Sequence, residues 1–195
     1  MKLDPLKSIG STAIHANSVE KYFKGNKLYG DDFTEEQLDA WFEEEKEGNS
    51  GVVLSNQKEY QYHYHELNLF HLFSRSNIPQ GANAIGLGSA YGDEFMPIAD
   101  RLRKITIIDP SDKFAENEAL NGTPIEYRKP SLNEKLDFPD NHFQLATSMG
   151  ALHHIANVTT VLREFYRCLT PGGYMLIREP IVTQGDWRYP RRGLT

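Results

Sequence analysis

The chain has 195 residues, of which 39% are hydrophobic and 25% are charged, so we expect one ordinary domain with a modest appendage. The composition excludes a disordered chain, and the single cysteine, Cys168, excludes a disulfide framework. The net charge of −6 repels phosphate backbones and argues against a nucleic-acid partner.

Residues 1–78 have helical patterns and predict an N-terminal helical cap or lid. The segment Thr34-Glu35-Glu36-Gln37 is a capping box, which predicts an acidic helix that ends near Gly48. A second helix is predicted from about Ser55 to Ser74, with Pro79 beyond its end. The apolar face of the first helix is expected to carry Leu38, Trp41 and Phe42.

The second predicted helix carries three histidines that raise the question of a metal site. His63 and His65 would lie about 200° apart around a helix axis, and no pair among His63, His65 and His71 has the i, i+4 spacing of a helical metal site. We therefore predict no metal. Tyr60 and Tyr64 share a face that either packs on the next domain or, together with His63, closes over a ligand as a lid.

Residues 79–180 alternate between strands and helices. Strands are predicted at 84–87, 105–108, 125–128, 143–148 and 174–177. Helices are predicted at 93–102, with a kink or a late start at Pro97, and also at 113–120 and 158–169. This alternation with short connections indicates crossovers between parallel strands and a sheet covered on both faces.

The first of these strands ends in a glycine-rich turn, Gly86-Leu87-Gly88-Ser89-Ala90-Tyr91-Gly92. Such a turn lets a ligand approach the backbone, and the helix that follows offers unpaired N–H groups. Asp109 ends the second strand, 21 positions after Gly88, where an acid can accept hydrogen bonds from both hydroxyls of a ribose. Asp109 can equally cap the helix that follows, and both features also suit a nicotinamide dehydrogenase.

Landmarks further along the chain separate these alternatives. Phe138-Pro139-Asp140-Asn141-His142-Phe143 precedes the fourth strand, and Met149-Gly150-Ala151-Leu152-His153-His154-Ile155 follows it. Leu162-Arg163-Glu164 then precedes Leu169-Thr170-Pro171-Gly172-Gly173 and the fifth strand. In the order and spacing of these landmarks, residues 83–180 resemble the class I S-adenosylmethionine-dependent methyltransferases, specifically the small-molecule branch with a methyltransferase type 11-like domain.

The resemblance implies an α/β fold at residues 79–180: a Rossmann-like, doubly wound, mostly parallel sheet of about five strands. It implies S-adenosyl-L-methionine as the cofactor, with its methionine moiety along the turn, its ribose on Asp109 and its adenine at Ser131 or Leu132. Ser148 and Met149 would form the floor of the site. The predicted cofactor-binding residues are therefore Gly86, Gly88, Ser89, Ala90, Gly92, Asp109, Ser131, Leu132, Ser148 and Met149.

Two positions depart from the family's pattern. Gly86 stands where the family has an acid that binds the methionine amino group, so other groups would have to hold that end of the cofactor. Ala90 replaces the middle glycine of the turn. Because alanine does not reach left-handed conformations as cheaply as glycine, we expect a reshaped loop.

His153 and His154 are the predicted catalytic residues, with His153 the first choice. They lie just past the carboxyl end of the fourth strand, where sites in open α/β sheets form. A histidine can be neutral and basic near physiological pH, and a general base assists transfer to a hydroxyl. The alternative is that the pair packs beneath the cofactor or caps the next helix.

We therefore expect an S-adenosylmethionine-dependent methyltransferase that acts on a small-molecule or sugar-like acceptor at a hydroxyl. One alternative is a catalytically degenerate binding module, which Gly86 and Ala90 motivate, and another is an NAD-dependent oxidoreductase. No apolar run approaches the roughly 20 residues of a membrane helix. The first residues lack the apolar core of a signal peptide. We expect a cytoplasmic protein with no membrane partner.

Residues 181–195 are expected to form a C-terminal tail rather than a strand, because they contain Pro190 and no alternating apolar pattern. Members of the family normally continue with two further strands. The strand at 174–177 would then be an uncovered edge, which invites pairing with another chain. We expect either that the C-terminal strands are missing from this chain or that a homodimer covers the edge.

Overall fold

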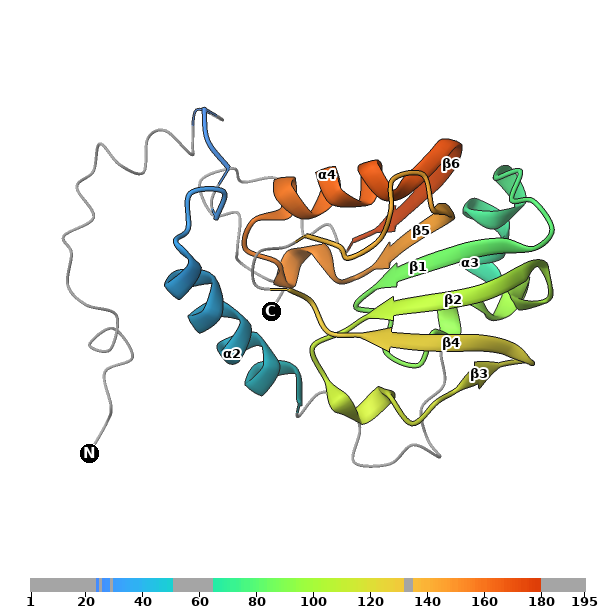
Figure 1. Cartoon of the computed structure of the whole chain (residues 1–195), viewed down its shortest axis with the longest axis horizontal. Coiled ribbons are helices and arrows are strands. Elements are labelled where there is room, and N and C mark those ends of the chain that lie inside the picture. Colours follow the sequence, from blue (N-terminus) through green and yellow to red (C-terminus); the bar gives the residue numbers. More distant parts are fainter. Residues whose placement is uncertain (1–23, 25, 29, 51–64, 132–134, 180–195) are drawn as a thin grey trace.

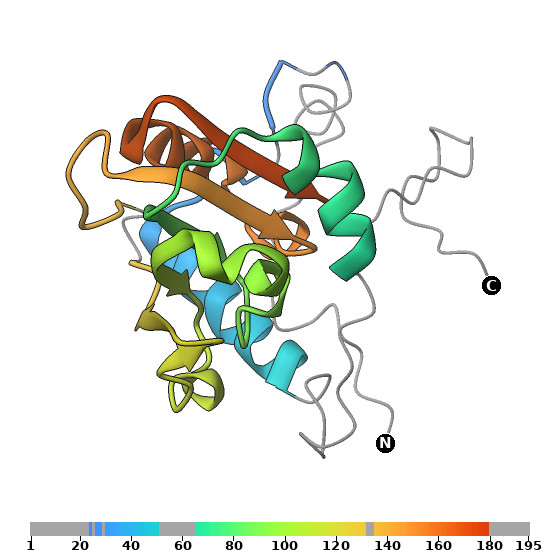
Figure 2. The same ribbon diagram turned by 90° about the vertical axis from the view of Figure 1, so that its right-hand side faces the viewer.

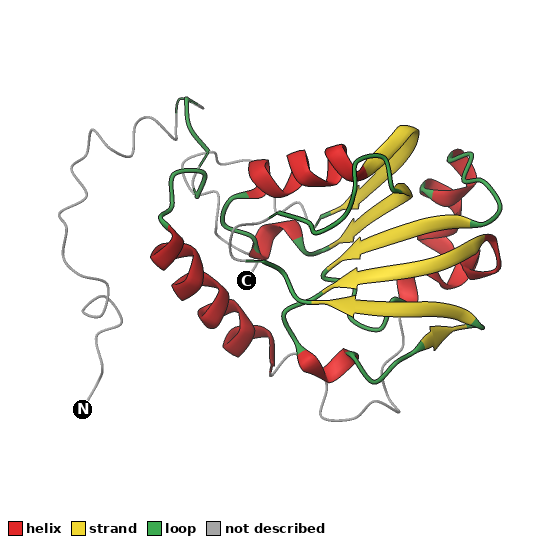
Figure 3. Ribbon diagram, in the orientation of Figure 1, coloured by secondary structure: helices red, strands yellow, loops and turns green. Residues whose placement is uncertain are grey.

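The computed structural model describes residues 24, 26–28, 30–50, 65–131 and 135–179. Its centre is one six-stranded sheet in the order β3-β4-β2-β1-β5-β6, which Figure 3 shows as a single layer with helices around it. The strands are β1 (Ala82–Leu87), β2 (Leu102–Ile108), β3 (Ala119–Leu120), β4 (Thr123–Arg128), β5 (Phe143–Met149) and β6 (Leu169–Arg178).

The sheet is mostly parallel, and each of the five predicted strands is present. β1 lies between β2 and β5, β2 also pairs with β4, and β5 also pairs with β6, all in parallel. The predicted helix over 113–120 is wrong, because only its start is helical, in the 3₁₀ helix η3 (Asp112–Phe114), and its last two residues form β3, which pairs antiparallel with β4. Asn121 and Gly122 both have positive φ and turn the chain into this hairpin. The Asn-Gly pair is a known hairpin signal that the sequence analysis missed.

The helices in the described residues are α2 (Glu35–Ser50), α3 (His65–His71), α4 (Val158–Cys168) and the 3₁₀ helices η1 (Phe73–Arg75), η2 (Asp93–Arg101), η3 (Asp112–Phe114) and η4 (Leu152–His154). The capping box is confirmed. The N–H of Thr34 donates to Gln37 Oε1 at 2.9 Å, and the N–H of Gln37 donates to Thr34 Oγ1 at 3.3 Å. The predicted start of the second helix, with Tyr60, His63 and Tyr64, lies outside the described residues.

Pro97 shapes the segment predicted as a helix over 93–102. Instead of an α-helix with a kink or a late start, the segment forms η2, a 3₁₀ helix that runs through Pro97 from Asp93 to Arg101. Proline has no N–H to donate and its ring crowds the preceding turn, so an α-helix is disfavoured there. The Pro97 prediction is wrong in form, although a helical segment is present.

A hydrophobic core covers each face of the sheet. On one face, Phe95 and Ile98 of η2 pack among the buried residues around Ala84 of β1. On the other face, Phe165 of α4 packs among the buried residues around Ile85 of β1. Consecutive strand residues thus point to opposite cores, as the pleat requires. α3 contacts η2 and lies beside it in Figure 2.

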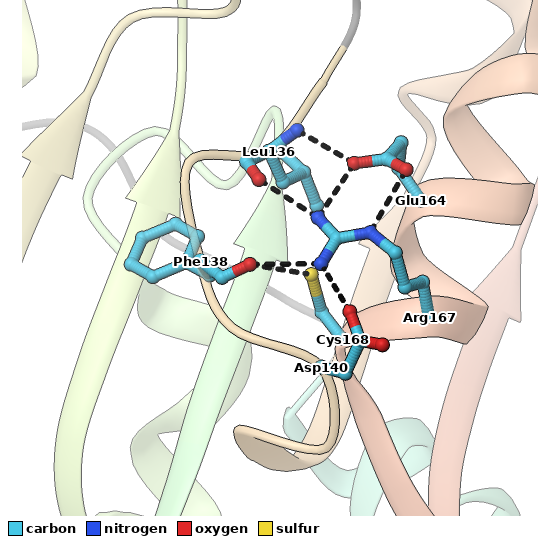
Figure 4. Close-up of polar contacts among 6 residues, drawn as sticks. All are labelled: Leu136, Phe138, Asp140, Glu164, Arg167 and Cys168. Carbon is cyan, nitrogen blue, oxygen red and sulfur yellow. Dashed lines mark hydrogen bonds and ion pairs between the residues drawn. The ribbon is translucent and has the colours of Figure 1, made fainter.

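Arg167 of α4 anchors the connection that leads into β5. Its guanidinium donates to the carbonyl oxygens of Leu136 and Phe138 at 2.9 Å each (Figure 4). It also donates to the carboxylates of Glu164 and Asp140 at 2.7 Å each. The hydrogen bond from Arg167 is the main reason that the pKa of Glu164 lies below its ordinary value, and this carboxylate also accepts from the N–H of Leu136.

The Arg167→Met variant is expected to lower the free energy of unfolding by about 1–3 kcal/mol, because two carbonyl oxygens and the Glu164 carboxylate lose their donor. Urea denaturation at pH 7 measures this change. Arg163→Met replaces an exposed arginine of the same helix and is the matched control, with an expected change within about 0.5 kcal/mol. Equal stabilities of the two variants would contradict the anchoring role of Arg167.

The carboxyl ends of the parallel strands lie at one edge of the sheet, and α2 crosses in front of that edge (Figure 1). β6 is the last strand of the sheet and, among the described residues, pairs only with β5. A homodimer that covers β6 remains a prediction. In the part of the chain that the structure describes, no helix has the length and apolar character needed to span a membrane.

Candidate functional site

The glycine-rich turn after β1 keeps its left-handed residues although alanine stands at its centre. Ala90 has a φ of +46°, between +62° at Gly88 and +77° at Gly92. The N–H of Ala90 donates to Asp109 Oδ2 at 3.3 Å, and its carbonyl oxygen accepts from the Tyr127 hydroxyl at 2.8 Å. These two contacts offset the cost of roughly 1–2 kcal/mol for a left-handed alanine. The turn is therefore left-handed with alanine at its centre, and the expectation of a reshaped loop stays a prediction.

Asp109 lies at the end of β2 and is almost completely buried. Its Oδ1 accepts from the N–H of Ser111 at 2.8 Å, and its Oδ2 accepts from the N–H of Ala90. Burial raises the pKa of Asp109, and these two hydrogen bonds oppose the rise. A carboxylate has about four acceptor positions, so Asp109 can hold the loop and still accept hydrogen bonds from a diol.

A cavity of about 290 Å³ lies at this edge of the sheet. Its apolar walls include Leu87, Ile108, Leu136 and Phe165, and Phe42 of α2 contributes from the cap. An apolar slot with a few polar groups at its rim is typical of a small-ligand site. The predicted site residues that line this cavity are Gly88, Ala90, Asp109, Ser131 and His154.

The other predicted residues lie beside the cavity or outside the described residues. Gly86, Ser89, Gly92, Ser148, Met149 and His153 do not belong to the cavity lining. Ser148 is completely buried, and its Oγ has no hydrogen-bond partner. Leu132 lies outside the described residues. The cavity is therefore lined by Asp109, the predicted ribose acceptor, and by Ser131, one of the two predicted adenine contacts.

The side chains of Ser89 and Phe95 fill the space beside Gly86, which the sequence alone did not predict. A Cβ at Gly86 would lie 2.1 Å from Ser89 Oγ and 2.9 Å from the Phe95 ring. Glu94, which is buried, accepts from the Thr147 hydroxyl at 3.3 Å. Thr147 is the residue on β5 that pairs with Gly86. Position 86 thus lacks the acid of the family, but the buried carboxyl group of Glu94 lies nearby.

His153 is paired with a carboxylate that the sequence analysis missed. Its Nδ1 lies 2.7 Å from Oε2 of Glu179, the residue directly after β6. Oε1 of Glu179 accepts from the N–H groups of Ala151 at 3.0 Å and Leu152 at 2.9 Å. Burial raises the pKa of Glu179, but the hydrogen bonds from His153 and these N–H groups outweigh it, and the net pKa is lowered.

This pairing leaves the other ring nitrogen of His153 available. Its Nε2 makes no hydrogen bond within the described part of the chain, and the side chain is 44% exposed. An ionised carboxylate beside Nδ1 favours the tautomer with the proton on Nδ1, so that Nε2 can accept a proton. The ring of His154 lies 3.9 Å from that of His153, and His154 lines the cavity.

α2 contacts the site through the apolar face predicted for it. Trp41 Nε1 donates to the carbonyl oxygen of His154 at 2.8 Å, and Phe42 lines the cavity. Leu38 is buried. Gly30, which precedes the helix, packs so closely on Ala156 that a Cβ there would lie 1.9 Å from the Ala156 carbonyl oxygen. The cap is therefore docked on the segment that follows β5.

Among the described residues, no group of three or more His, Cys, Asp or Glu side chains could hold a metal ion. His71 is exposed on α3, whereas nothing is described for the side chains of His63 and His65. The prediction of no metal site stays a prediction for the chain as a whole.

Comparison with known proteins identifies relatives of this domain. The methyltransferase domain family matches residues 85–177. The ubiquinone/menaquinone biosynthesis C-methyltransferase UbiE of Psychromonas ingrahamii is 29% identical over 114 residues, which are 53% of this chain and 45% of that protein. The sterol 4-C-methyltransferase strm-1 of Caenorhabditis elegans is 26% identical over 118 residues, which are 58% of this chain and 35% of that protein.

A solved structure, the 4+2 cyclase SpnF, shares the fold with a TM-score of 0.56 and 20% sequence identity, over 80% of this chain and 65% of that chain. This chain spans less than half of the length of each of the two sequence relatives, 45% and 35%. The parallel sheet, the turn after β1 and the family match agree. Residues 85–177 therefore belong to the class I S-adenosylmethionine-dependent methyltransferases.

Proposed function

We propose that this protein transfers the methyl group of S-adenosylmethionine to a hydroxyl of a small-molecule acceptor. The observation that carries the proposal is that the segment following β5 takes part in both sites at the carboxyl edge of the sheet: it lines the Asp109 cavity through His154, and it carries His153, which pairs with Glu179. One part fits the adenosine of the cofactor, and the other supplies an oriented base.

The cofactor supplies, when bound, a sulfonium methyl group that is already a strong electrophile. The chain then has to align the acceptor and accept its proton. Glu179 holds the His153 ring, and the Nε2 of His153 takes the proton from the acceptor hydroxyl. The resulting imidazolium is stabilised by the Glu179 carboxylate 2.7 Å away. His154, at the cavity wall, is the second candidate for the base.

Methylation at a carbon is the second candidate, because the two sequence relatives are named as C-methyltransferases. A base that removes a phenol or enol proton also raises the electron density of the adjacent carbon, so the same histidine would serve either outcome. A panel of catechols, demethylmenaquinol, sterols and sugars, with the products examined by mass spectrometry and NMR, distinguishes O- from C-methylation. The net charge of −6 makes nucleic acid a poor acceptor.

Calorimetric titration tests the proposal against its two rivals. A methyltransferase binds S-adenosylmethionine and S-adenosylhomocysteine and does not bind NAD. An oxidoreductase shows the reverse preference. A degenerate binding module binds the methionine cofactor but methylates no member of the panel. The fold also supports other chemistry, since SpnF is named as a cyclase.

The Asp109→Ala variant is expected to bind S-adenosylhomocysteine about 1–3 kcal/mol more weakly, because a charged acceptor for the ribose hydroxyls is lost. Titration calorimetry measures the affinity, and circular dichroism checks the fold. Asp112→Ala is the matched control, since Asp112 is exposed and lies outside the cavity lining. Unchanged affinity in Asp109→Ala would contradict our placement of the ribose.

A further inference from the structure

The turn after β1 has two sides with different chemistry. Gly88 and Ala90 face the cavity. Ser89, between them, faces Gly86 instead, where its Oγ takes the position of a side chain that glycine lacks. Ser89 is 8% exposed, and its Oγ has no hydrogen-bond partner. A buried hydroxyl without a partner is uncommon in folded proteins, so it indicates a position where a bound group completes the hydrogen bonding.

A buried carboxyl group lies behind this hydroxyl. Glu94 is 3% exposed and stands in the first turn of η2, two residues after the last glycine of the turn. Thr147 donates to its Oε1, and Ser89 lies close enough to lower its pKa. The groups that shift the pKa of Glu94 are the hydroxyls of Ser89 and Thr147, its own N–H and the acid Asp93, with no cation among them. Within the described residues, nothing therefore neutralises this carboxylate when it is ionised.

We propose that Glu94, together with the Ser89 hydroxyl, binds the ammonium group of the cofactor's amino-acid moiety, in place of the side chain that Gly86 lacks. This inference rests on the proposed function. Gly88 and Ala90, which flank Ser89, both line the Asp109 cavity, so a cofactor whose adenosine occupied that cavity would have its amino-acid moiety close to this turn. The Ser89 hydroxyl would accept a hydrogen bond from the ammonium, and Glu94 would supply the opposite charge.

The protonation of Glu94 makes the inference measurable. Burial raises the pKa of Glu94 to about 7, and the nearby Asp93 adds to the rise, whereas the hydroxyls of Ser89 and Thr147 and its own N–H oppose it. The other titratable side chain that interacts with it is Tyr127 of β4, whose own pKa Glu94 raises. Before binding, Glu94 is therefore about half protonated at neutral pH.

An ammonium beside Glu94 favours the carboxylate, so binding lowers this pKa and releases a proton. Near pH 7, S-adenosylhomocysteine is expected to release about half a proton per molecule bound, and its affinity should rise about tenfold from pH 6 to pH 8. Calorimetry in phosphate and in Tris separates the proton release from the binding heat. The control ligand is 5′-methylthioadenosine, which lacks the ammonium and should show neither effect.

The Glu94→Gln variant is expected to bind S-adenosylhomocysteine about 10- to 100-fold more weakly, as for the loss of a charged hydrogen-bond partner. Its affinity for 5′-methylthioadenosine should change less than about twofold. The pH dependence of S-adenosylhomocysteine binding should disappear in this variant. Asp100→Asn, an exposed acid on the same helix, is the matched control and should behave like the wild type.

The outcomes separate a failure of the inference about Glu94 from a failure of the proposed function. If the wild type binds neither ligand, both the proposed function and the inference fail. If it binds both ligands without proton release or pH dependence, the function stands and the role of Glu94 is wrong. An equal loss for both ligands in Glu94→Gln also overturns the inference, because Glu94 would then act only by shaping the loop. Should the variant fail to fold, the wild-type proton release still decides.

Discussion

Replacement of His153 by alanine is expected to lower turnover by about 10²–10⁴-fold, the usual contribution of a general base. The physical reason is that the Glu179 carboxylate, 2.7 Å from Nδ1, leaves Nε2 as the proton acceptor. Turnover is measured as S-adenosylhomocysteine formed with whichever acceptor of the panel is methylated. The affinity for S-adenosylhomocysteine should barely change, because His153 does not line the adenosine cavity.

Three further variants locate the base. His154→Ala tests the neighbouring ring, and His71→Ala, at an exposed position on α3, is the control that should keep full activity. Glu179→Gln keeps the shape of the side chain but removes the charge that selects the His153 tautomer, so its activity should fall as well. If both His153→Ala and His154→Ala keep full activity, alignment alone suffices and the two histidines are structural.

Replacement of Gly86 by aspartate is expected to destabilise the fold by about 2–5 kcal/mol rather than to restore a missing cofactor contact. A Cβ at this position would lie 2.1 Å from Ser89 Oγ and 2.9 Å from the Phe95 ring, which is fully buried. The aspartate would also bring a second carboxyl group close to Glu94. The melting temperature should fall by roughly 10 °C.

Two variants separate the steric cause from a general effect of the substitution. Gly122→Asp is the control, since a Cβ there would meet nothing within 4 Å, and its cost is the roughly 1–2 kcal/mol of a left-handed residue. Gly86→Asp combined with Ser89→Gly removes the closest contact and should recover part of the lost stability. A Gly86→Asp variant as stable as the wild type would show that Ser89 and Phe95 move aside freely.

Local signals in the sequence predicted the elements of the fold. The capping box at Thr34 forms as predicted because both of its hydrogen bonds join residues three positions apart. The five longer strands are found because buried parallel strands need continuous apolar runs. β3 was missed although the Asn121-Gly122 turn signal was present, and the form of η2 was missed because the effect of Pro97 depends on the packing around it.

The sequence also determined the polar end of the cavity. The glycine-rich turn and Asp109 each follow a strand, and a parallel sheet brings the carboxyl ends of its strands to one edge. Asp109 and Ala90 are 19 positions apart in the chain, yet hydrogen-bond in the structure. The pattern of strands alone was enough to place them together.

Only the tertiary structure decided which side chains contact one another at the carboxyl edge of the sheet. Thr147 and Glu94 are 53 positions apart, His153 and Glu179 are 26 apart, and Trp41 and His154 are 113 apart. Each pair joins two elements whose relative rotation is set by side-chain packing in the core, which no short sequence pattern records. A glutamate in the first turn of a helix is usually an exposed dipole partner. Glu94 is buried instead because its neighbours Phe95 and Ile98 pack in the core and hold η2 against the sheet beside Gly86. Since glycine has no side chain, there is room for η2 to approach the sheet at this position.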